Sequence, residues 1–225
     1  MRFYRKNIRL ITICALLGSC ASLDTNKIAP GYFAAYSSIK AAIFGYEDIN
    51  ITRDLVKSIP YASAKLKIGK GSSGLLILES IKDNQKTWVS ADNILLLTRD
   101  GRIIRTLGLI NNLTSYQSVS QSFKDLLSNP NPLLNYYSYY SYDEPSLLNL
   151  EIEVSLLVKG PEDIEILGRV RSLVLVEELI TNKEINWTRR NKYWVDPDTF
   201  FVWKSIQHIS PKLPKFVFEV TKKPA

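Results

Sequence analysis

Residues 94–107 read ILLLTRDGRIIRTL, two apolar segments on either side of the pair Asp100-Gly101. Asp-Gly is a strong signal for a two-residue β-hairpin turn, because both residues tolerate the positive φ that such a turn needs. We therefore expect strands over 94–98 and 103–107 that pair antiparallel. The stretch is typical of an antiparallel meander.

Short segments with alternating or continuous apolar character recur along the rest of the chain, and glycine or Asn/Asp turns separate them. The expected strands include 64–68, 75–78, 87–90, 150–154, 164–166, 169–176, 193–195, 201–205 and 216–220, with turns at 69–74, 82–85, 160–163 and 196–198. Residues 126–145 are expected to interrupt the sheet, because the run Ser128-Asn129-Pro130-Asn131-Pro132 cannot form a central strand. The five tyrosines between 136 and 142 are interpreted as a tyrosine-rich loop.

Residues 31–46 differ from this pattern, because their apolar residues recur at helical spacing. With roughly ten to thirteen strands and one clear helix, the sequence predicts a mainly β fold. We expect a single antiparallel β-barrel-like domain over residues 31–225 with an N-terminal helix, since closure of the sheet removes exposed strand edges. No fixed-period repeat or linker indicates a second domain.

The first 19 residues have the layout of a secretory signal, with four cations followed by an apolar run and small residues. The apolar run is shorter than the roughly 20 residues that a membrane-spanning helix needs. Leu17–Cys20 (LGSC) then resembles a bacterial lipobox, in which a cysteine thiolate accepts a lipid. We therefore expect removal of residues 1–19, lipidation of Cys20 and a tether over 20–30.

This arrangement predicts an envelope lipoprotein of a diderm bacterium, held in the membrane by the acyl chains on Cys20. Residue 21 is alanine and not aspartate, which favours sorting to the outer membrane, at its periplasmic face. Cys14 lies in the leader, so the mature chain is expected to have no disulfide and no cysteine metal site.

The 225-residue chain has a formal charge of +7, and it retains +3 once the four cations of the leader are removed. A mild positive charge can attract anionic polymers or lipid headgroups but is ordinary for solubility. No basic run with interleaved aromatic residues indicates a nucleic-acid partner. His208 is the single histidine, which disfavours a histidine metal site. We expect neither a metal nor another cofactor.

Six stretches carry a resemblance to a known family: Ile59–Ser63 (IPYAS), Ile68–Gly71 (IGKG), Trp88–Asp92 (WVSAD), Thr98–Leu109 (TRDGRIIRTLGL), Tyr193–Pro197 (YWVDP) and Val202–Gln207 (VWKSIQ). Together they look like the YjbF/GfcB (YmcC-like) family of bacterial lipoproteins, linked to exopolysaccharide and group 4 capsule production. The likeness covers nearly the whole mature chain, in the right order, behind the lipobox. One residue departs from it: Phe200 stands where the pattern after Asp-Pro-x-Thr leads us to expect a glycine turn.

The resemblance implies a mostly β, barrel-like lipoprotein at the periplasmic face of the outer membrane. It implies two neighbours of the same pathway, a periplasmic partner and an outer-membrane β-barrel protein. It brings no established enzymatic activity and no catalytic residues to carry over.

Arginines around the Asp100-Gly101 turn are the first candidates for binding. Arg99, Arg102 and Arg105 form the densest cationic spot of the sequence. We expect this spot to contact an acidic polymer or an acidic partner surface.

The tyrosine-rich segment is the second candidate. Its members are Tyr136, Tyr137, Tyr139 and Tyr140. Tyrosine rings stack on sugars while their hydroxyls form hydrogen bonds, so a glycan is one possible ligand. A partner protein and the membrane interface, where tyrosine is also favoured, remain open as alternatives.

Three functions follow from these patterns. The first is a non-catalytic lipoprotein that assists assembly or secretion of a surface polysaccharide, which itself is a possible ligand. The second is a polysaccharide-modifying hydrolase, and the third is an outer-membrane structural lipoprotein unrelated to polysaccharide. A hydrolase needs two carboxyl groups about 5–10 Å apart. The acidic residues Glu151, Glu153, Asp163 and Glu165 instead alternate with Ile and Val, as on solvated strand faces. We therefore expect no enzyme.

Overall fold

The computed structural model describes residues 50–118, 122–128 and 133–224. The predicted signal, the tether with Cys20 and the helix expected at 31–46 lie outside these residues. The elements in chain order are α3 (Arg53–Ser58), β1 (Ser63–Ile68), β2 (Ser73–Lys82), β3 (Gln85–Ser90), β4 (Leu95–Arg99), β5 (Arg102–Leu107), β6 (Leu113–Ser118), α4 (Phe123–Ser128), β7 (Leu133–Tyr142), β8 (Leu147–Ile166), β9 (Arg169–Asn182), β10 (Trp187–Val195), β11 (Val202–Gln207) and β12 (Phe216–Lys222).

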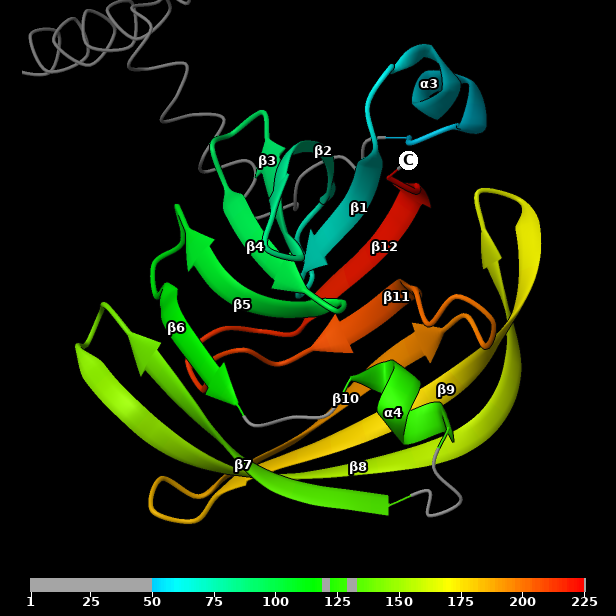
Figure 1. Cartoon of the computed structure of the whole chain (residues 1–225). Helices are drawn as coiled ribbons and strands as arrows, with labels where there is room; N and C mark the ends of the chain where they lie inside the picture. The colour runs from blue at the N-terminus through cyan, green and yellow to red at the C-terminus, as the bar shows by residue number, and fades with distance from the viewer. Residues whose placement is uncertain (1–49, 119–121, 129–132, 225) are drawn as a thin grey trace, which may run out of the picture. The chain divides into compact units, whose positions relative to one another are not determined.

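The twelve described strands form one antiparallel sheet in the order β5-β4-β3-β2-β1-β12-β11-β10-β9-β8-β7-β6. The sheet curls into a nearly closed barrel (Figure 1). Its two edge strands, β5 and β6, follow each other in the chain, and the Leu113 amide donates a 2.9 Å hydrogen bond to Thr106 Oγ1 across this seam. The predicted mainly β, barrel-like fold is confirmed.

The predicted turn at Asp100-Gly101 is confirmed. Arg99 pairs with Arg102, so the loop has two residues, with φ of 48° at Asp100 and 77° at Gly101. Both residues thus have the positive φ of a type I′ turn. The turn expected within 82–85 also forms, at Asp83 and Asn84 with φ of 50° and 61°.

The prediction of a turn at 160–163 is wrong. β8 continues through Gly160 to Ile166, and the chain reverses at Leu167 and Gly168, where φ is 48° and 71°. Gly160 instead lies at an irregularity in the β8–β9 register, with φ of 120°. A bulge uses the conformational freedom of glycine as a turn does, so the composition of this segment does not distinguish the two.

The prediction of a tyrosine-rich loop is also wrong. Residues 133–142 form strand β7, which pairs with β6 and β8. Tyrosine has a high preference for strands, and the prolines end before the strand begins. The β7 side chains alternate across the sheet. Ser138, Tyr140 and Tyr142 are buried, whereas Tyr137 is exposed.

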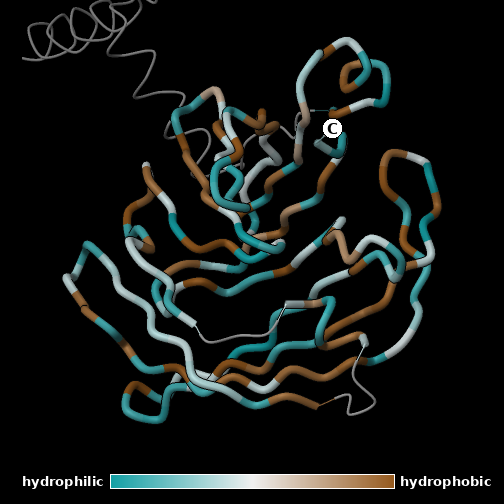
Figure 2. Tube along the Cα trace, in the orientation of Figure 1, coloured by the Kyte–Doolittle hydropathy of each residue, from teal (hydrophilic) through white to brown (hydrophobic). Residues whose placement is uncertain are grey.

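The main apolar core fills the barrel with inward residues of most strands. Ala64, Leu76, Leu96, Ile152 and Ile180 have no exposed surface. Complete burial of a Leu or Ile side chain contributes about 1.5–3 kcal/mol. Apolar and polar positions alternate along the strands, as the colours of Figure 2 show. This alternation places one face of each strand in the core.

Helix α4 supplies a second apolar cluster. Phe123 and Leu126 pack against Val176, Tyr193 and Val195. The Phe123 and Tyr193 ring centroids are 5.1 Å apart. In the part of the chain that the structure describes, no helix has the length and apolar character needed to cross a membrane.

Candidate functional site

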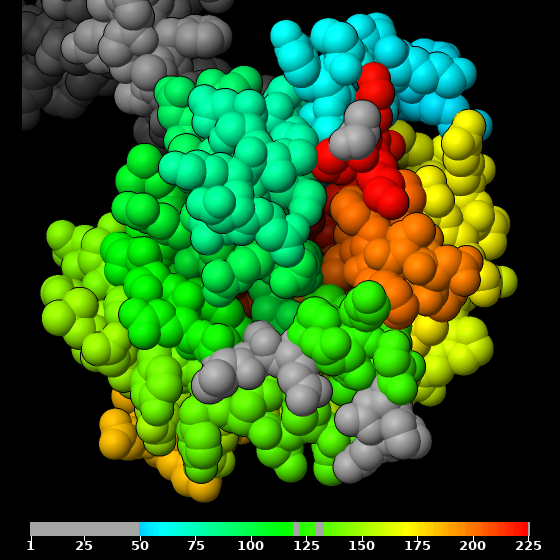
Figure 3. All heavy atoms as spheres, in the orientation of Figure 1, coloured from blue at the N-terminus to red at the C-terminus, as the bar shows by residue number. Residues whose placement is uncertain are grey.

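The barrel has two ends, and one of them carries a cleft. This end holds the β2–β3, β4–β5, β8–β9 and β10–β11 turns, the end of β12 and α4, and we call it the α4 end. The cleft has a volume of about 370 Å³. It is a hollow between the teal atoms of β2 and β3 and the red and orange atoms of β12 and β11 (Figure 3). Its size and its position in a barrel mouth are typical of ligand sites.

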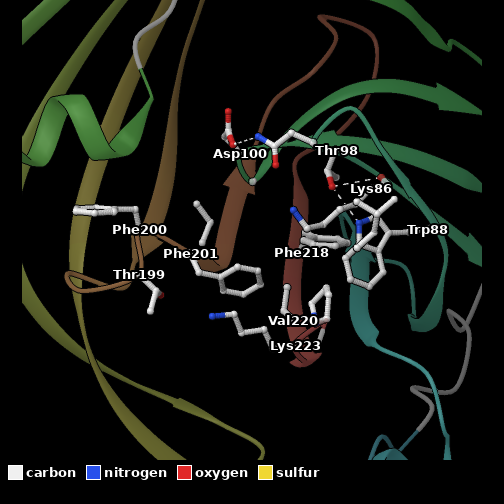
Figure 4. Close-up of a pocket in the computed structure, with 15 residues that line it drawn as sticks. Lys86, Trp88, Thr98, Asp100, Thr199, Phe200, Phe201, Phe218, Val220 and Lys223 are labelled. Carbon is white, nitrogen blue, oxygen red and sulfur yellow. Dashed lines mark hydrogen bonds between the residues drawn. The ribbon is translucent and has the colours of Figure 1, made fainter.

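Segments far apart in the sequence build this cleft. They come from the β2–β3 hairpin, the β4–β5 turn, the β10–β11 turn and the end of β12 (Figure 4). The described lining residues are Ile81, Asn84, Lys86, Trp88, Thr98, Asp100, Gly101, Thr199, Phe200, Phe201, Val202, Phe218, Val220, Lys223 and Pro224.

Aromatic rings form much of the cleft wall. Trp88 is 1% exposed and meets Phe218 edge to face, with ring centroids 5.4 Å apart. The Trp88 indole N–H donates a 3.0 Å hydrogen bond to Thr98 Oγ1, so its polar atom is satisfied. Phe201 comes from the β10–β11 side and packs edge to face on Trp203 at 5.1 Å. These contacts fix the rings, so the wall is preorganised.

Polar and charged groups lie between these rings. Asn84 Nδ2 donates a 2.8 Å hydrogen bond to Asp100 Oδ1, which joins the β2–β3 turn to the β4–β5 turn. Lys86 extends from β3 into the space in front of Phe218 (Figure 4). The Lys223 ammonium lies 4.8 Å from the centre of the Phe201 ring, a cation–π contact. The cleft thus offers apolar faces, hydrogen-bonding groups and two cations.

Asp196 organises the β10–β11 turn. Its Oδ1 accepts hydrogen bonds from the amides of Asp198 and Thr199, at 3.1 and 2.8 Å. The Phe200 amide donates to the Asp196 carbonyl at 2.9 Å. Burial alone would raise the pKa of Asp196, but the hydrogen bonds from Thr199 and its neighbours outweigh burial and lower it. The carboxylate therefore stays ionised and holds the turn.

Phe200 adopts a φ of 58° in this turn. The family resemblance led us to expect glycine at this position, and the backbone does have the conformation that glycine favours. A bulky residue in this region is strained. Its ring lies on the opposite side of the cleft from Trp88 and Phe218 (Figure 4).

A buried polar network inside the barrel holds the residues of the cleft wall in place. Gln207 of β11 donates from Nε2 to the Gly101 carbonyl at 2.9 Å and accepts at Oε1 from the Ile103 amide at 2.9 Å. Gly101 also packs so tightly on Val202 that a Cβ there would lie 2.4 Å from the valine. The β4–β5 turn is therefore fixed against β11 across the barrel.

Arg102 and Glu178 are the charged centre of this network. Arg102 Nε lies 3.2 Å from Glu178 Oε1, and both side chains are about 95% buried. The guanidinium carbon is 4.3 Å from the centre of the Phe123 ring and 5.2 Å from that of Tyr193. Arg102 Nη2 has no hydrogen-bond partner among the described residues.

Three neutral side chains also form hydrogen bonds with Glu178. It accepts hydrogen bonds from Tyr136 at 3.2 Å, Asn191 at 2.8 Å and Tyr193 at 2.9 Å. Burial and then the negative charge of Glu178 raise the pKa of both tyrosines, so their hydroxyls remain protonated donors. The carboxylate thus pairs with Arg102 and accepts three further hydrogen bonds.

The three candidate arginines do not share one exposed surface, although Arg99 and Arg102 pair across the turn. Arg102 is 4% exposed and points into the barrel, which corrects the prediction that it belongs to an exposed cationic spot. Arg99 is half-buried and Arg105 is exposed. The physical reason is the buried partner of Arg102, Glu178, 76 residues away in the chain. A contact of Arg99 or Arg105 with a polymer or partner stays a prediction.

The four candidate tyrosines divide between the two faces of β7. Tyr140 is 5% exposed and packs on Tyr116 and Trp187, and Tyr136 contacts Glu178, so these two contribute to the interior. Tyr137 is 48% exposed, and Tyr139 donates to Glu151 at 3.1 Å. A binding role for Tyr137 and Tyr139 stays a prediction.

Sequence reasoning missed most of the cleft. Trp88 and Phe200 were noticed, but Lys86, Phe218 and Lys223 were not considered as site residues. One usable signal was the alternation in Gln85–Ser90, which places Lys86 on the same inward face as Trp88. Among the described residues, no cluster of His, Cys, Asp and Glu could hold a metal ion.

Comparison with known proteins gives related lipoproteins. The chain is 29% identical over 177 residues to "Uncharacterized lipoprotein GfcB" of Escherichia coli (strain K12), covering 76% of this chain and 80% of that protein. It is 24% identical over 197 residues to "Uncharacterized lipoprotein YjbF" of the same strain, covering 86% and 87%.

A solved structure has the same fold. The crystal structure of the hypothetical lipoprotein YmcC from Escherichia coli (K12) matches with a TM-score of 0.67 and 24% identity, over 84% of this chain and 95% of that one. The family model described as "Group 4 capsule polysaccharide lipoprotein gfcB, YjbF" matches residues 36–220. The match includes the strands, the turns and the cleft up to Val220, and the chain therefore belongs to this family of capsule polysaccharide lipoproteins.

Proposed function

We propose that this lipoprotein assists the assembly or secretion of a surface polysaccharide without catalysing a reaction, and that its cleft holds a segment of the polymer. The family description supports a role related to capsule polysaccharide. The observation that carries the proposal is the cleft, because the partly exposed Phe201 ring, held by Trp203 and placed beside hydrogen-bonding groups, is suited to a sugar ring.

The composition of the cleft supports binding over hydrolysis. Its described lining contains one carboxylate, Asp100, and that group is hydrogen-bonded to Asn84. Glycoside hydrolysis commonly uses two carboxyl groups, one as acid and one as base or nucleophile. The hydrolase therefore remains the second candidate, with Asp100 as the residue on which it would depend.

We further propose that acylated Cys20 anchors the chain at the periplasmic face of the outer membrane. Two or three acyl chains give stable attachment, whereas one chain is marginal. A periplasmic partner and an outer-membrane β-barrel protein would meet the domain there, and the exposed Arg105 side chain is a candidate contact.

Complementation of a gene deletion tests the proposal. Wild-type protein should restore extracellular polymer, and the double variant Phe200→Gly/Lys86→Gln should restore much less at equal protein level. The control Lys82→Gln changes a lysine of the same β2–β3 hairpin outside the cleft lining and should behave as wild type. Full polymer output from the double variant would refute a role for the cleft.

Two further alleles separate the alternatives. Asp100→Asn keeps a residue that tolerates positive φ and removes the carboxylate, so a binding protein should retain its polymer output. Complete loss of output with this folded variant would favour the hydrolase. Cys20→Ser should release the protein from the outer-membrane fraction, and mass spectrometry of the wild type should find acyl chains on Cys20.

A further inference from the structure

Phe200 combines a strained backbone with a side chain outside the apolar core. Its φ of 58° strains any side chain other than glycine. Phe201 next to it packs on the main core, but Phe200 belongs to neither apolar cluster of the described residues. Phe200 instead lies at the edge of the cleft lining, and its ring is directed away from the other labelled side chains (Figure 4). A partly exposed ring at this edge can contact a ligand that extends out of the cleft.

The charges of the cleft indicate the kind of ligand. Lys86 is half-buried on the inward face of β3 and has no ion-pair partner among the described residues. Partial burial of an unpaired ammonium is unfavourable, and a bound anion would relieve it. Lys223 adds a second cation at the Phe201 ring. Asp100 is the single carboxylate of the described lining and already accepts a hydrogen bond from Asn84, so the cleft keeps a net positive charge.

We propose that the cleft binds an acidic saccharide, with Phe201 against the C–H face of a sugar ring, Phe200 at the edge where the saccharide leaves the cleft, and Lys86 and Lys223 at its carboxylate. This inference names the substrate class of the proposed function and rests on it. Ring faces account for binding of a sugar, since stacking does not depend on charge. The lysines account for selection of an acidic over a neutral sugar, because the charged contact forms only with an anion.

The test measures saccharide binding to the full-length lipidated protein in detergent. Trp88 lies in the cleft wall, so tryptophan fluorescence reports occupancy, and titration calorimetry gives the dissociation constant. The probes are oligogalacturonate and hyaluronan oligosaccharides, neutral maltooligosaccharides of matched length, and inorganic phosphate. At least one acidic oligosaccharide should bind about tenfold or more tightly than the neutral ones, and the difference should shrink as salt rises.

The variants separate the two kinds of contact. Lys86→Gln should lower the affinity for acidic saccharides about tenfold and leave the affinity for neutral saccharides unchanged. Lys82→Gln should alter neither affinity. Phe200→Gly should lower the affinity for both classes of saccharide. Its melting temperature should equal or exceed that of the wild type, because glycine relieves the backbone strain. A gain in stability with a loss of binding is a result that a purely structural Phe200 would not give.

Several results would overturn the inference. Equal affinity for acidic and neutral saccharides, or Lys86→Gln behaving as Lys82→Gln, would exclude selection of an acidic sugar but leave the proposed function intact. Inorganic phosphate that competes as well as the acidic saccharides would indicate a simple anion site. If no saccharide binds and the cleft variants restore full polymer output, both the inference and the proposed function fail.

Discussion

Replacing Glu178 by glutamine is expected to lower the free energy of unfolding by about 3–5 kcal/mol, because the change leaves the buried Arg102 charge without its counterion. The two groups are 3.2 Å apart and both side chains are about 95% buried. Glutamine has nearly the same size as glutamate, so packing is preserved and the charge is the main difference.

The magnitude follows from the geometry. Two unit charges 3.2 Å apart interact by about 5 kcal/mol at an effective dielectric constant of about 20. The glutamate also accepts from Tyr136, Asn191 and Tyr193, and a glutamine amide presents one acceptor oxygen where the carboxylate presents two. At least one buried donor then loses its partner, which costs about 1–3 kcal/mol more. The desolvation cost of the buried carboxylate disappears together with its charge and offsets part of this sum, so the net loss stays at about 3–5 kcal/mol.

Urea unfolding at pH 7, followed by far-UV circular dichroism and tryptophan fluorescence, measures the loss. The matched control is Glu177→Gln, one residue earlier on β9. Glu177 pairs with Arg190 and Lys192, whose side chains are 60% and 39% exposed, so its replacement should cost less than about 1 kcal/mol. In the double variant Arg102→Met/Glu178→Gln the uncompensated charge is gone, and more than half of the lost stability should return.

Two results would contradict this reasoning. If Glu178→Gln unfolds within about 1 kcal/mol of the wild type, the pair is not buried together as described. If the double variant is as unstable as the single one, the loss comes from disturbed packing or hydrogen bonding and not from the isolated charge.

Three further predictions concern the opposite end of the barrel. Asn112→Ala removes a side chain that donates to Asp143 Oδ2 at 2.7 Å beside the β5–β6 seam, and should cost about 1–3 kcal/mol in urea unfolding; an unchanged midpoint would exclude a role in closure. Tyr142→Phe leaves the Ile209 carbonyl without its 2.9 Å donor and should cost a similar amount, whereas an equally stable variant would show that water replaces the hydroxyl. Burial lowers the pKa of His208, so the unfolded chain takes up its proton more readily. Stability should be complete above the unfolded pKa of about 6.5 and fall as the pH drops below it, and His208→Asn should flatten that dependence in melts between pH 5 and 7.

Local patterns in the sequence were sufficient for most of the fold. Asp100-Gly101 and the alternation on either side determine a hairpin by themselves, since turn geometry and side-chain direction depend on neighbouring residues. The error at 133–142 has the same local origin. The proline-rich run predicts an interruption of the sheet, and the extension of this interruption to the tyrosines that follow is wrong. Their alternation across β7 already matches a strand.

The candidate site was harder to predict, because its residues meet only after the barrel closes. Arg102 flanks a turn and carries a charge, and both features usually indicate exposure. Its burial depends on Glu178, which reaches it from another strand across the barrel. No short window of sequence contains both residues, so the pair could not be recognised without the topology.

Arg102 nevertheless belongs to the site, as a positioning residue and not as a contact. It follows Gly101, whose carbonyl is held by Gln207 and whose Cα packs on Val202, and both Gly101 and Val202 line the cleft. Tyr193 hydrogen-bonds Glu178 and lies 3.4 Å from Gln207, so the ion pair and the turn share one network. A loss of the ion pair should therefore loosen the β4–β5 wall and weaken saccharide binding in Glu178→Gln, even under conditions where that variant is fully folded. Removal of the Glu177 pair on the outer face should not, because its partners reach neither the network nor the cleft.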